Sequence, residues 1–376
     1  MTPPTSHFRQ AASVGQGVAV IALLGWGFWQ GITAMATPEA QERIRQTLSF
    51  QSLLKGETAA AVNHAMAHSL PVDPLFRATG GVLRWKLFGS AGPQVRAGCD
   101  DWLFLTEELR PWPDAAEHQA ARVAALKRAA AKLAEQQIQL LVAVVPDKAR
   151  VYAEELCGAP WSAQSQARYA GFVADLQAAE LRHVSLLPAM EAAKANGTVF
   201  YRTDTHWSQA GAATAAEAIA PVVRQMGIEP AERFRTVAEA EETNGPGDLL
   251  RLMSLDKVPD WLRPAPDRQH KETTEAEQSA AAGGGGLLDE TPAPPVTLIG
   301  SSYSVNGNFH GRLQQALGVT VGNFAQAGGG FFRAAADYFN GEAFRETPPK
   351  LVVWEIPERV IGQPIEPAER RFLDRW

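Results

Sequence analysis

The sequence predicts a three-layer α/β/α domain with a mainly parallel sheet, preceded by an N-terminal transmembrane helix. Three observations favour this fold class. Short apolar runs typical of buried strands alternate with amphipathic helical patterns over residues 114–354. The segments between them are long enough for the crossover helices that parallel pairing requires. Finally, Val14 to Ala36 is an almost uninterrupted apolar run, and a bilayer is crossed by about 20 such residues.

The N-terminal run determines the expected topology. Arg9 precedes it and Glu39 follows it, so the positive-inside tendency keeps residues 1–13 in the cytoplasm and exports the rest. Ala34-Met35-Ala36 also fits a signal-peptidase site. Residues 14–36 are therefore either a retained signal anchor or a removed signal peptide, and both place the rest of the chain outside the cytoplasm.

Residues 37–95 are expected to form a helical stalk followed by loops. The segment 38–68 is rich in Ala, Glu and Gln, which favours helix. Prolines and glycines are frequent from 70 to 94, which indicates loops. A strand at 101–105 then begins the second domain, which we place at 96–376.

Apolar periodicity defines the elements of this second domain. A helix that Asp114 can cap runs to about residue 137, with apolar residues at i, i+3, i+7 and i+10 from Val123. The apolar run 138–145 ends at Pro146, which is typical of a buried strand. Later strands are expected at 184–187, 296–299, 319–324 and 351–354, and later helices around 169–176, at 208–226 and at 309–317.

One segment interrupts the alternation. Residues 264–295 contain several prolines, many polar residues and the run Gly283 to Gly286, a composition that buries too little apolar surface to become ordered. A phosphate-binding glycine loop would need a following Lys-Ser/Thr and a helix start, and the sequence has neither. We therefore expect a disordered insertion.

Composition argues against a nucleic-acid partner, and the two cysteines permit a disulfide. Lys plus Arg number 35 against 41 Asp plus Glu, a net charge of −6 without a basic block, which argues against nucleic acid. Cys99 and Cys157 both lie in the exported part, where a disulfide is permitted. It would close a 58-residue span (157 minus 99) and stabilise the fold by about 4 kcal/mol. Two separate buried thiols are the alternative.

Two stretches carry the residue types of acyl transfer. If Tyr201–Ser208 is extended, Asp204 and His206 project from the same side of the backbone. Such a carboxylate fixes the tautomer of the imidazole and stabilises the imidazolium. Ser302 follows an apolar run and lies just past Gly300, in a turn that can present a hydroxyl to a cleft. The hypothesis is an Asp204, His206, Ser302 triad.

These residues also have simpler interpretations. A lone histidine is more often structural, and Gly-Ser-Ser is often only a turn. Ser301 and Ser304 compete with Ser302 for the role of nucleophile. The sequence has no H-E-x-x-H motif and no metal-binding cysteine spacing, so we expect no metal site.

The remaining parts of the site are expected around the nucleophile. The backbone amide of Ser302 and donors near Asn323 or Gly328 are candidates for the oxyanion hole. Tyr303 is a candidate for a cleft wall or a substrate contact. The glycines can equally mark a tight turn.

Both motifs resemble those of a known family. The stretches Asp204-Thr205-His206-Trp207 and Gly300-Ser301-Ser302-Tyr303-Ser304 are similar to motifs of the SGNH-hydrolase-like acetyltransferases of exopolysaccharide O-acetylation, the alginate acetylation proteins of the AlgJ and AlgX type. The resemblance covers roughly Phe50 to the C-terminus. Further similar stretches are Gly98–Leu105, Val145–Lys148, Gly247–Leu249 and Trp354–Arg359.

The resemblance implies an SGNH-hydrolase-like fold and a role for each site residue. Ser302 would be the nucleophile, His206 the general base, Asp204 its orienter and Asn323 the match to the SGNH asparagine. No metal and no cofactor are implied. The chain stops soon after Trp354, so it looks like the membrane-anchored AlgJ type, without the carbohydrate-binding module of the AlgX type.

The function implied by the resemblance is an inner-membrane O-acetyltransferase that faces the periplasm. It would move an acetyl group through an acetyl-serine onto hydroxyls of an alginate-like exopolysaccharide. The implied partners are a membrane-bound O-acyltransferase that supplies acetyl groups and other exopolysaccharide secretion proteins. Two alternatives stay open: an acetylesterase with the same triad, and a non-catalytic polysaccharide-binding component of a secretion complex, whose 10 tryptophans would include sugar platforms.

Overall fold

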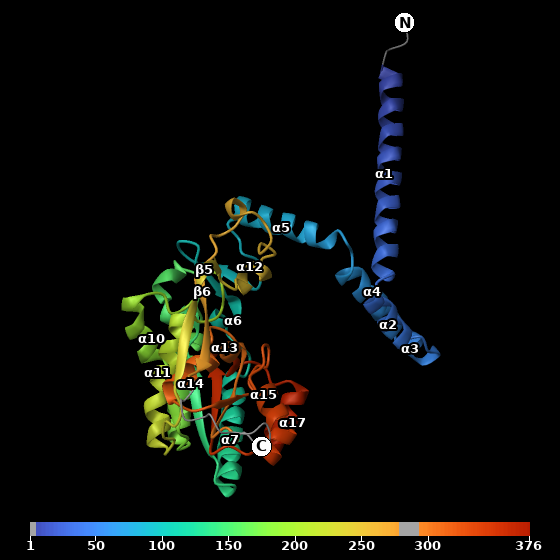
Figure 1. The fold of residues 1–376 in the computed structure, drawn as a ribbon. Coiled ribbons are helices and arrows are strands. Elements are labelled where there is room, and N and C mark those ends of the chain that lie inside the picture. Colours follow the sequence, from blue (N-terminus) through green and yellow to red (C-terminus); the bar gives the residue numbers. More distant parts are fainter. Residues whose placement is uncertain (1–4, 278–292) are drawn as a thin grey trace. The chain divides into compact units, whose positions relative to one another are not determined.

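The computed structural model describes residues 5–277 and 293–376, and the chain divides into two compact units (Figure 1). The first unit ends at Leu83 and contains the apolar N-terminal helix, while the second runs from Arg84 to Trp376 and contains the main sheet. The boundary lies inside helix α5 (Asp73–Phe88), earlier in the chain than the expected domain start at residue 96.

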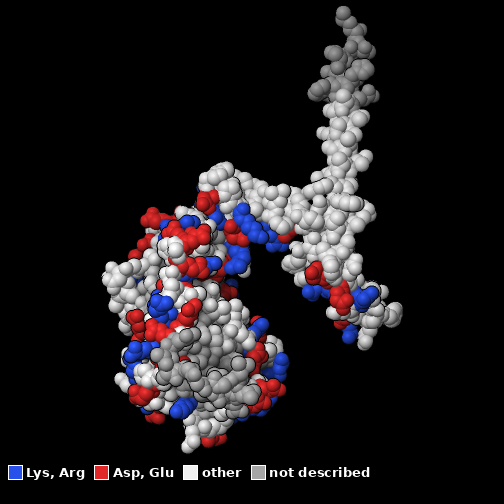
Figure 2. All heavy atoms as spheres, viewed as in Figure 1, with Lys and Arg blue, Asp and Glu red and all other residues white. Residues whose placement is uncertain are grey.

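Helix α1 (Thr5–Met35) contains the predicted membrane span. Ala11–Met35 has a mean hydropathy of 1.5, so its length and composition allow it to cross a membrane. Figure 2 shows this stretch without Lys, Arg, Asp or Glu. The same length and composition are found in a signal sequence near the N-terminus.

The helices expected over 38–68 are confirmed, as α2 (Pro38–Gln46), α3 (Phe50–Leu54) and α4 (Glu57–His68). The loops expected over 70–94 are wrong, because most of that stretch is the helix α5. Pro74 lies in the first turn of α5, where a missing N–H breaks no helical hydrogen bond. Its glycines weaken a helix but do not forbid one.

The second unit is organised around a five-stranded parallel sheet of order β4-β3-β9-β7-β8. Its strands are β3 (Gln139–Val145), β4 (His183–Ser185), β7 (Val296–Ile299), β8 (Val321–Asn323) and β9 (Leu351–Pro357). The corresponding predicted strands are confirmed, although β4 and β8 are shorter and β9 is longer than expected. Strands β7 and β9 are buried along their whole length, as expected for a parallel sheet with both faces covered.

Helices cover both faces of the sheet, which confirms the three-layer class (Figure 1). Alternate residues of β3 point to opposite faces: Leu141 and Ala143 lie in one core, and Val142 and Val144 in the other. The first core contains residues of α10 (Leu187–Ala193), α11 (Gln209–Gln225) and α14 (Phe309–Leu317). The second contains residues of α7 (Ala115–Glu135), α9 (Ala163–Ala178), α15 (Arg333–Asn340) and α17 (Pro367–Arg375).

Short elements lie between these, mostly at the carboxyl ends of the strands. They are α6 (Thr106–Leu109), α8 (Lys148–Val151), η1 (Ala153–Leu156), η2 (Lys194–Asn196), α12 (Asp248–Leu252), η3 (Asp260–Leu262), α13 (Ser302–Val305), α16 (Glu342–Glu346) and η4 (Glu358–Val360). The predicted cap of α7 is not formed, because Asp114 adopts a left-handed conformation and its side chain accepts no hydrogen bond from the helix.

An antiparallel pair of strands corrects the expected disordered insertion. Strand β5 (Phe234–Asn244) pairs with β6 (Arg268–Ala276), so residues 268–276 are ordered. Their polar composition suggested disorder, but the two strands satisfy each other's backbone groups and need little apolar surface to do so. Residues 278–292 of the expected insertion lie outside the described residues.

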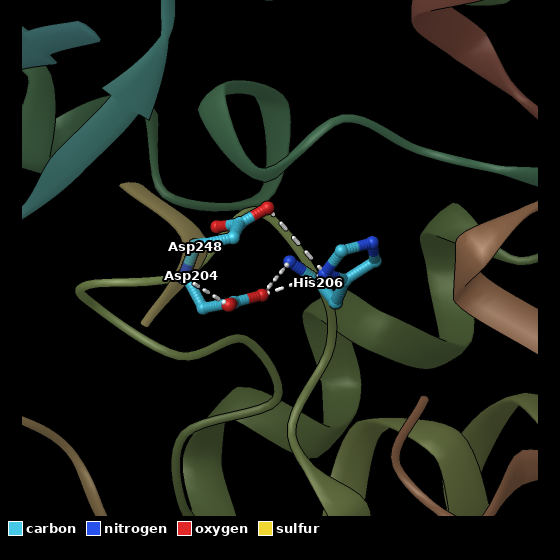
Figure 3. A group of neighbouring side chains, drawn as sticks. All are labelled: Asp204, His206 and Asp248. Atoms are coloured by element: carbon cyan, nitrogen blue, oxygen red, sulfur yellow. Dashed lines mark hydrogen bonds and ion pairs between the residues drawn. The ribbon is translucent and has the colours of Figure 1, made fainter. Parts of the chain in front are cut away.

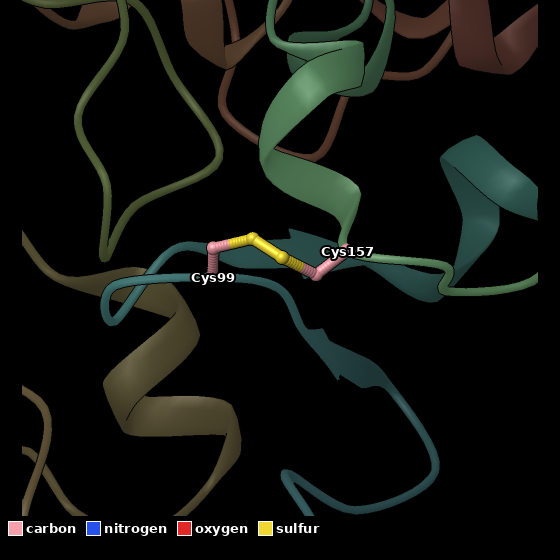
Figure 4. The surroundings of a disulfide bond; sticks show 2 residues. All are labelled: Cys99 and Cys157. Atoms are coloured by element: carbon pink, nitrogen blue, oxygen red, sulfur yellow. A yellow bond between two sulfur atoms is a disulfide. The ribbon is translucent and has the colours of Figure 1, made fainter.

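A disulfide joins Cys99 to Cys157, with the Cα atoms 5.5 Å apart (Figure 4). Cys99 lies in the turn between β1 (Val95–Ala97) and β2 (Leu103–Leu105), and Cys157 follows η1. The two cysteines are therefore not separate thiols. The linked turn precedes Leu103, whose amide donates to the carbonyl of Arg202 at 3.0 Å.

Candidate active site

Ser302 lies at the carboxyl end of β7, where the chain turns into α13. Glu355 of β9 accepts hydrogen bonds from the Ser301 amide at 2.7 Å and from the Ser304 hydroxyl at 3.0 Å, and so fixes the turn. Gly300 has no room for a side chain, because a Cβ atom would lie 2.6 Å from Glu355 Oε2. Burial raises the pKa of the Glu355 carboxyl, and the hydrogen bonds from Ser301 and Ser304 oppose that shift.

The same contacts separate the three serines that compete for the role of nucleophile. The hydroxyls of Ser301 and Ser304 both donate to the buried carboxyl of Glu355. The hydroxyl of Ser302 lies 2.7 Å from His206 Nε2 instead. Ser302 is thus the serine of this turn that reaches a base.

Asp204 and His206 come together through a tight loop, which corrects the expectation of an extended segment. Phe200 and Trp207 form an isolated antiparallel bridge, and the residues between them bend. Asp204 Oδ1 accepts the amide of His206 at 2.9 Å, which is the local turn that aspartate side chains favour two residues ahead. Local hydrogen bonding, and not strand alternation, therefore brings the two side chains together.

The three side chains form a continuous relay. His206 Nδ1 lies 2.6 Å from Asp204 Oδ1 (Figure 3), and His206 Nε2 lies 2.7 Å from Ser302 Oγ. Burial favours the neutral carboxyl of Asp204, but the hydrogen bond and charge of His206 outweigh it and lower the pKa of Asp204 to about 2. Asp204 is ionised at neutral pH and can stabilise an imidazolium.

A second carboxylate lies beside the imidazole. Asp248 Oδ2 is 3.7 Å from His206 Nδ1, and Figure 3 shows Asp204 and Asp248 both directed toward His206. The Asp248 amide donates to Asp204 Oδ2 at 2.6 Å, while Asp248 Oδ1 accepts the amide of Thr205 at 2.7 Å. Burial and the charge of Asp204 raise the pKa of Asp248. Asp248 lies in the stretch Gly247–Leu249, which resembles the family, but its sequence pattern predicted no role for it.

Two further residues, which the sequence did not predict, bind the backbone of the loop that contains Asp204 and His206. The ammonium of Lys148 is buried and donates to the carbonyls of Tyr201, Arg202 and Asp204 at 3.0, 3.2 and 2.6 Å. Burial lowers the pKa of Lys148. Asp267 accepts the amides of Arg202 and Thr203 at 2.9 and 2.8 Å. A cation thus binds the carbonyls of the loop and a carboxylate binds its amides.

Tyr303 packs against the imidazole of His206. It is fully buried, its ring stands edge-on to the His206 ring at 5.1 Å, and its hydroxyl donates to the Thr205 carbonyl at 3.0 Å. Burial raises the pKa of Tyr303 well above its ordinary value. Tyr303 is therefore a neutral phenol whose hydroxyl binds the loop backbone and whose ring packs against the imidazole.

The candidate oxyanion donors differ in placement. The Ser302 amide stands at the start of α13 and donates to no other described residue. Asn323 ends β8 opposite Leu298, and its side-chain oxygen accepts the Ala325 amide at 3.1 Å. Gly328 is exposed and left-handed, with a φ of 71°. Within the described residues, no hydrogen bond joins Asn323 or Gly328 to Ser302 or His206.

Asp204, His206 and Asp248 also lie close enough together to be metal ligands. The 2.6 Å contact between His206 Nδ1 and Asp204 Oδ1 is a direct hydrogen bond, which leaves no space for an ion bound by both atoms. The second nitrogen of the imidazole faces Ser302. The arrangement therefore fits proton transfer from a serine better than metal binding.

Comparison with known proteins identifies the family. Residues 95–358 match the model of the SGNH hydrolase-like domain of the acetyltransferase AlgX, a stretch that includes every residue of the relay. The chain belongs to this acetyltransferase family. It is 36% identical over 320 residues to the probable alginate O-acetylase AlgJ of Pseudomonas aeruginosa, covering 82% of this chain and 81% of that relative. Identity to the protein of that name from Pseudomonas putida is 34% over 357 residues, covering 94% and 90%.

Solved structures of the AlgX acetyltransferase family have the same fold. The O-acetyltransferase domain of Pseudomonas putida AlgJ superposes with a TM-score of 0.66 at 34% identity, covering 75% of this chain and 98% of that domain. Pseudomonas aeruginosa AlgX superposes with a TM-score of 0.57 at 22% identity, covering 74% of this chain and 65% of AlgX, which supports the fold alone. The expected SGNH-hydrolase-like fold is confirmed.

Proposed function

We propose that the chain is a periplasmic O-acetyltransferase that acetylates hydroxyls of an exopolysaccharide through an acetyl-serine intermediate. The observation that carries the proposal is the continuous relay from Asp204 through His206 to Ser302, with contacts of 2.6 and 2.7 Å. Membership of the acetyltransferase family supports the acyl group. The relatives' name, probable alginate O-acetylase, supports alginate as the acceptor.

The relay supplies both halves of a transfer reaction. Ser302 Oγ attacks the acetyl carbonyl while His206 Nε2 takes the hydroxyl proton, and the tetrahedral intermediate collapses as His206 returns that proton to the leaving group. A sugar hydroxyl then loses its proton to His206 and attacks the acetyl-serine. Collapse of the second intermediate forms the sugar ester and restores Ser302. Ionised Asp204 stabilises the imidazolium in both halves, and the Ser302 amide is our proposed oxyanion donor.

Two features support the proposed location of the enzyme. Helix α1 is apolar enough to serve as a single-pass anchor, and the disulfide between Cys99 and Cys157 fits an oxidising compartment such as the periplasm. Acetyl donors are cytoplasmic, so we propose that a membrane-bound O-acyltransferase delivers acetyl groups to Ser302 and that other secretion proteins supply the polymer. This mechanism uses only groups of the protein chain and requires no cofactor.

Mass spectrometry of the intact protein after incubation with an activated acetyl ester tests the proposal. We expect one acetyl adduct, mapped to Ser302, in the wild type and none in Ser302→Ala or His206→Ala. Transfer of that acetyl group to a polysaccharide, faster than to water, separates the transferase from an acetylesterase. Retained acetyl transfer in Ser302→Ala would show that the relay is not the site of catalysis.

A further inference from the structure

A pocket outside the relay has the chemistry of an anion-binding site. Its volume is about 330 Å³, at the lower end of the roughly 300–1,000 Å³ of ligand pockets and suited to a single sugar residue. Arg96 and Arg110 contribute guanidinium groups, and Trp161 contributes an aromatic surface. The hydroxyls of Thr106 and Ser162 also line the pocket, where they donate to the Pro93 carbonyl and to the Ser165 hydroxyl and leave their oxygens as acceptors. None of the residues that line the pocket is acidic.

Both arginines are available to a ligand. Within the described residues neither forms an ion pair. Arg110 lies over the ring of Trp112 at 3.5 Å, and Arg96 Nη1 donates to the carbonyl of Gly92 at 3.1 Å. These contacts orient the guanidinium groups without neutralising them. An oriented, unpaired guanidinium is the group that recognises a carboxylate in a bidentate manner.

Other contacts fix the remaining walls. Arg150 lies 5.4 Å from the ring of Trp161 and forms an ion pair with Glu358, so the indole packs against a fixed neighbour. Ser162 is the N-cap of α9, a helix of 16 residues whose N-terminal partial charge also favours an anion. The pocket thus combines positive charge, an aromatic surface and hydroxyl oxygens that can accept hydrogen bonds, which match the carboxylate, the apolar ring face and the hydroxyls of a uronic acid.

The pocket and the nucleophile lie at the same end of the sheet. Arg150, which packs on Trp161, follows the carboxyl end of β3, and Ser302 follows the carboxyl end of β7. Only β9 separates these strands, and adjacent strands lie about 4.8 Å apart, so their ends are about 10 Å apart. A polymer of a few sugar residues can span the distance between these two strand ends.

We propose that this pocket binds a uronate residue of the polysaccharide acceptor while another residue of the same polymer meets Ser302. The proposal rests on the proposed function for the identity of the acceptor as a polyuronate. It assigns Arg96 and Arg110 to carboxylate recognition and Trp161 to packing against the sugar ring.

Isothermal titration calorimetry of the full-length chain in detergent, with an unacetylated oligouronate, tests the pocket. We expect Arg96→Gln and Arg110→Gln each to raise Kd about 10- to 100-fold, the usual loss for a charge-assisted hydrogen bond. The matched control is Arg345→Gln on α16, which removes the same charge from an exposed arginine whose side chain donates to a backbone carbonyl. Its Kd is expected to stay within about twofold of wild type. Thermal melting verifies that each variant is folded.

A carboxyl-reduced oligosaccharide of the same length provides the second probe. It is expected to bind weakly to wild type and equally weakly to both arginine variants. Unchanged oligouronate binding in both folded variants, or equally tight binding of the reduced oligosaccharide, would overturn the proposal. Acetylation of Ser302 is measured separately. Arginine-dependent binding without an acetyl adduct on Ser302 would contradict the proposed function and still support uronate binding in the pocket.

Discussion

At the scale of single residues, the two carboxylates beside His206 have different duties. Asp204 Oδ1 is within hydrogen-bond distance of Nδ1, at 2.6 Å, and its pKa is lowered to about 2. Asp248 is 3.7 Å from the same nitrogen and its pKa is raised. Asp204 is therefore the partner that sets the tautomer, while Asp248 binds the backbone of the loop and places a second carboxylate near the imidazole.

Substitution of each carboxylate by its amide separates these duties. Asp204→Asn is expected to lower kcat for acetyl transfer about 10³- to 10⁴-fold, because the imidazole loses its ionised acceptor. Asp248→Asn is expected to cost about 10-fold, because it weakens the electrostatic support of the imidazolium without removing the hydrogen bond. Losing a nearby negative charge also shifts the acidic limb of the pH–rate profile of Asp248→Asn to lower pH. Equal losses in the two variants would contradict this division.

The lowered pKa of Asp204 predicts how stability depends on pH. Its carboxyl titrates at about 2 in the folded chain and at 3.8 in an unfolded reference. Ionised Asp204 therefore stabilises the fold above about pH 4, by about 2 kcal/mol, and this contribution is lost as pH falls from about 4 to about 2. Urea denaturation from pH 5 to pH 2 measures it. Because the raised pKa of Asp248 acts in the opposite direction, the comparison is Asp204→Asn against the parent in an Asp248→Asn background.

At the scale of elements, the catalytic loop has no regular structure of its own and depends on charged groups from other segments. Lys148 of α8 binds three of its carbonyls, and Asp267, just before β6, binds two of its amides. Irregular backbone that is buried must find such partners, because unpaired amides and carbonyls are costly in the interior. The loop is thus positioned by residues 53 or more positions away in sequence.

Removal of the Lys148 ammonium tests this support. Lys148→Met keeps much of the apolar stem but leaves three carbonyls without their donor, so we expect a loss of about 2–4 kcal/mol in the free energy of unfolding. The rate of Ser302 acetylation at saturating ester should fall as well, because the loop orients His206. Lys257→Met, at an exposed lysine, is the matched control and should change neither quantity. A stable Lys148→Met variant with normal acetylation would show that the loop does not depend on the Lys148 ammonium.

At the scale of the whole molecule, the chain separates an N-terminal unit that contains the apolar helix α1 from a second unit that contains the sheet, the disulfide and the relay. Both hydrophobic cores that flank the sheet are made of residues of the second unit. The chemistry and the membrane attachment are therefore assigned to different parts of the chain.

A shortened chain that begins at Asp73, and so keeps α5 intact, tests this separation. We expect it to be recovered in the soluble fraction, with acetylation of Ser302 by an activated ester within about twofold of the full chain. The full chain is expected to stay with membranes after alkaline carbonate extraction, because an apolar helix of this length resists it. Loss of the cooperative melting transition in the shortened chain would show that the first unit is needed for folding.

The sequence by itself determined the α/β/α class, the parallel sheet and the pair of motifs, because burial imposes a short-range apolar pattern on each strand and helix. The sequence-based prediction was wrong at α5 and β6. In α5, proline and glycine suggested loops, but Pro74 lies in the first turn, where a helix tolerates it. In β6, polar residues suggested disorder, but the segment pairs with β5. Only the tertiary structure decided which serine meets His206 and brought in Asp248, Lys148 and Asp267. All of these contacts join residues far apart in the chain. Asp248, Lys148 and Asp267 also bind backbone atoms, which are the same in every residue and leave no sequence pattern.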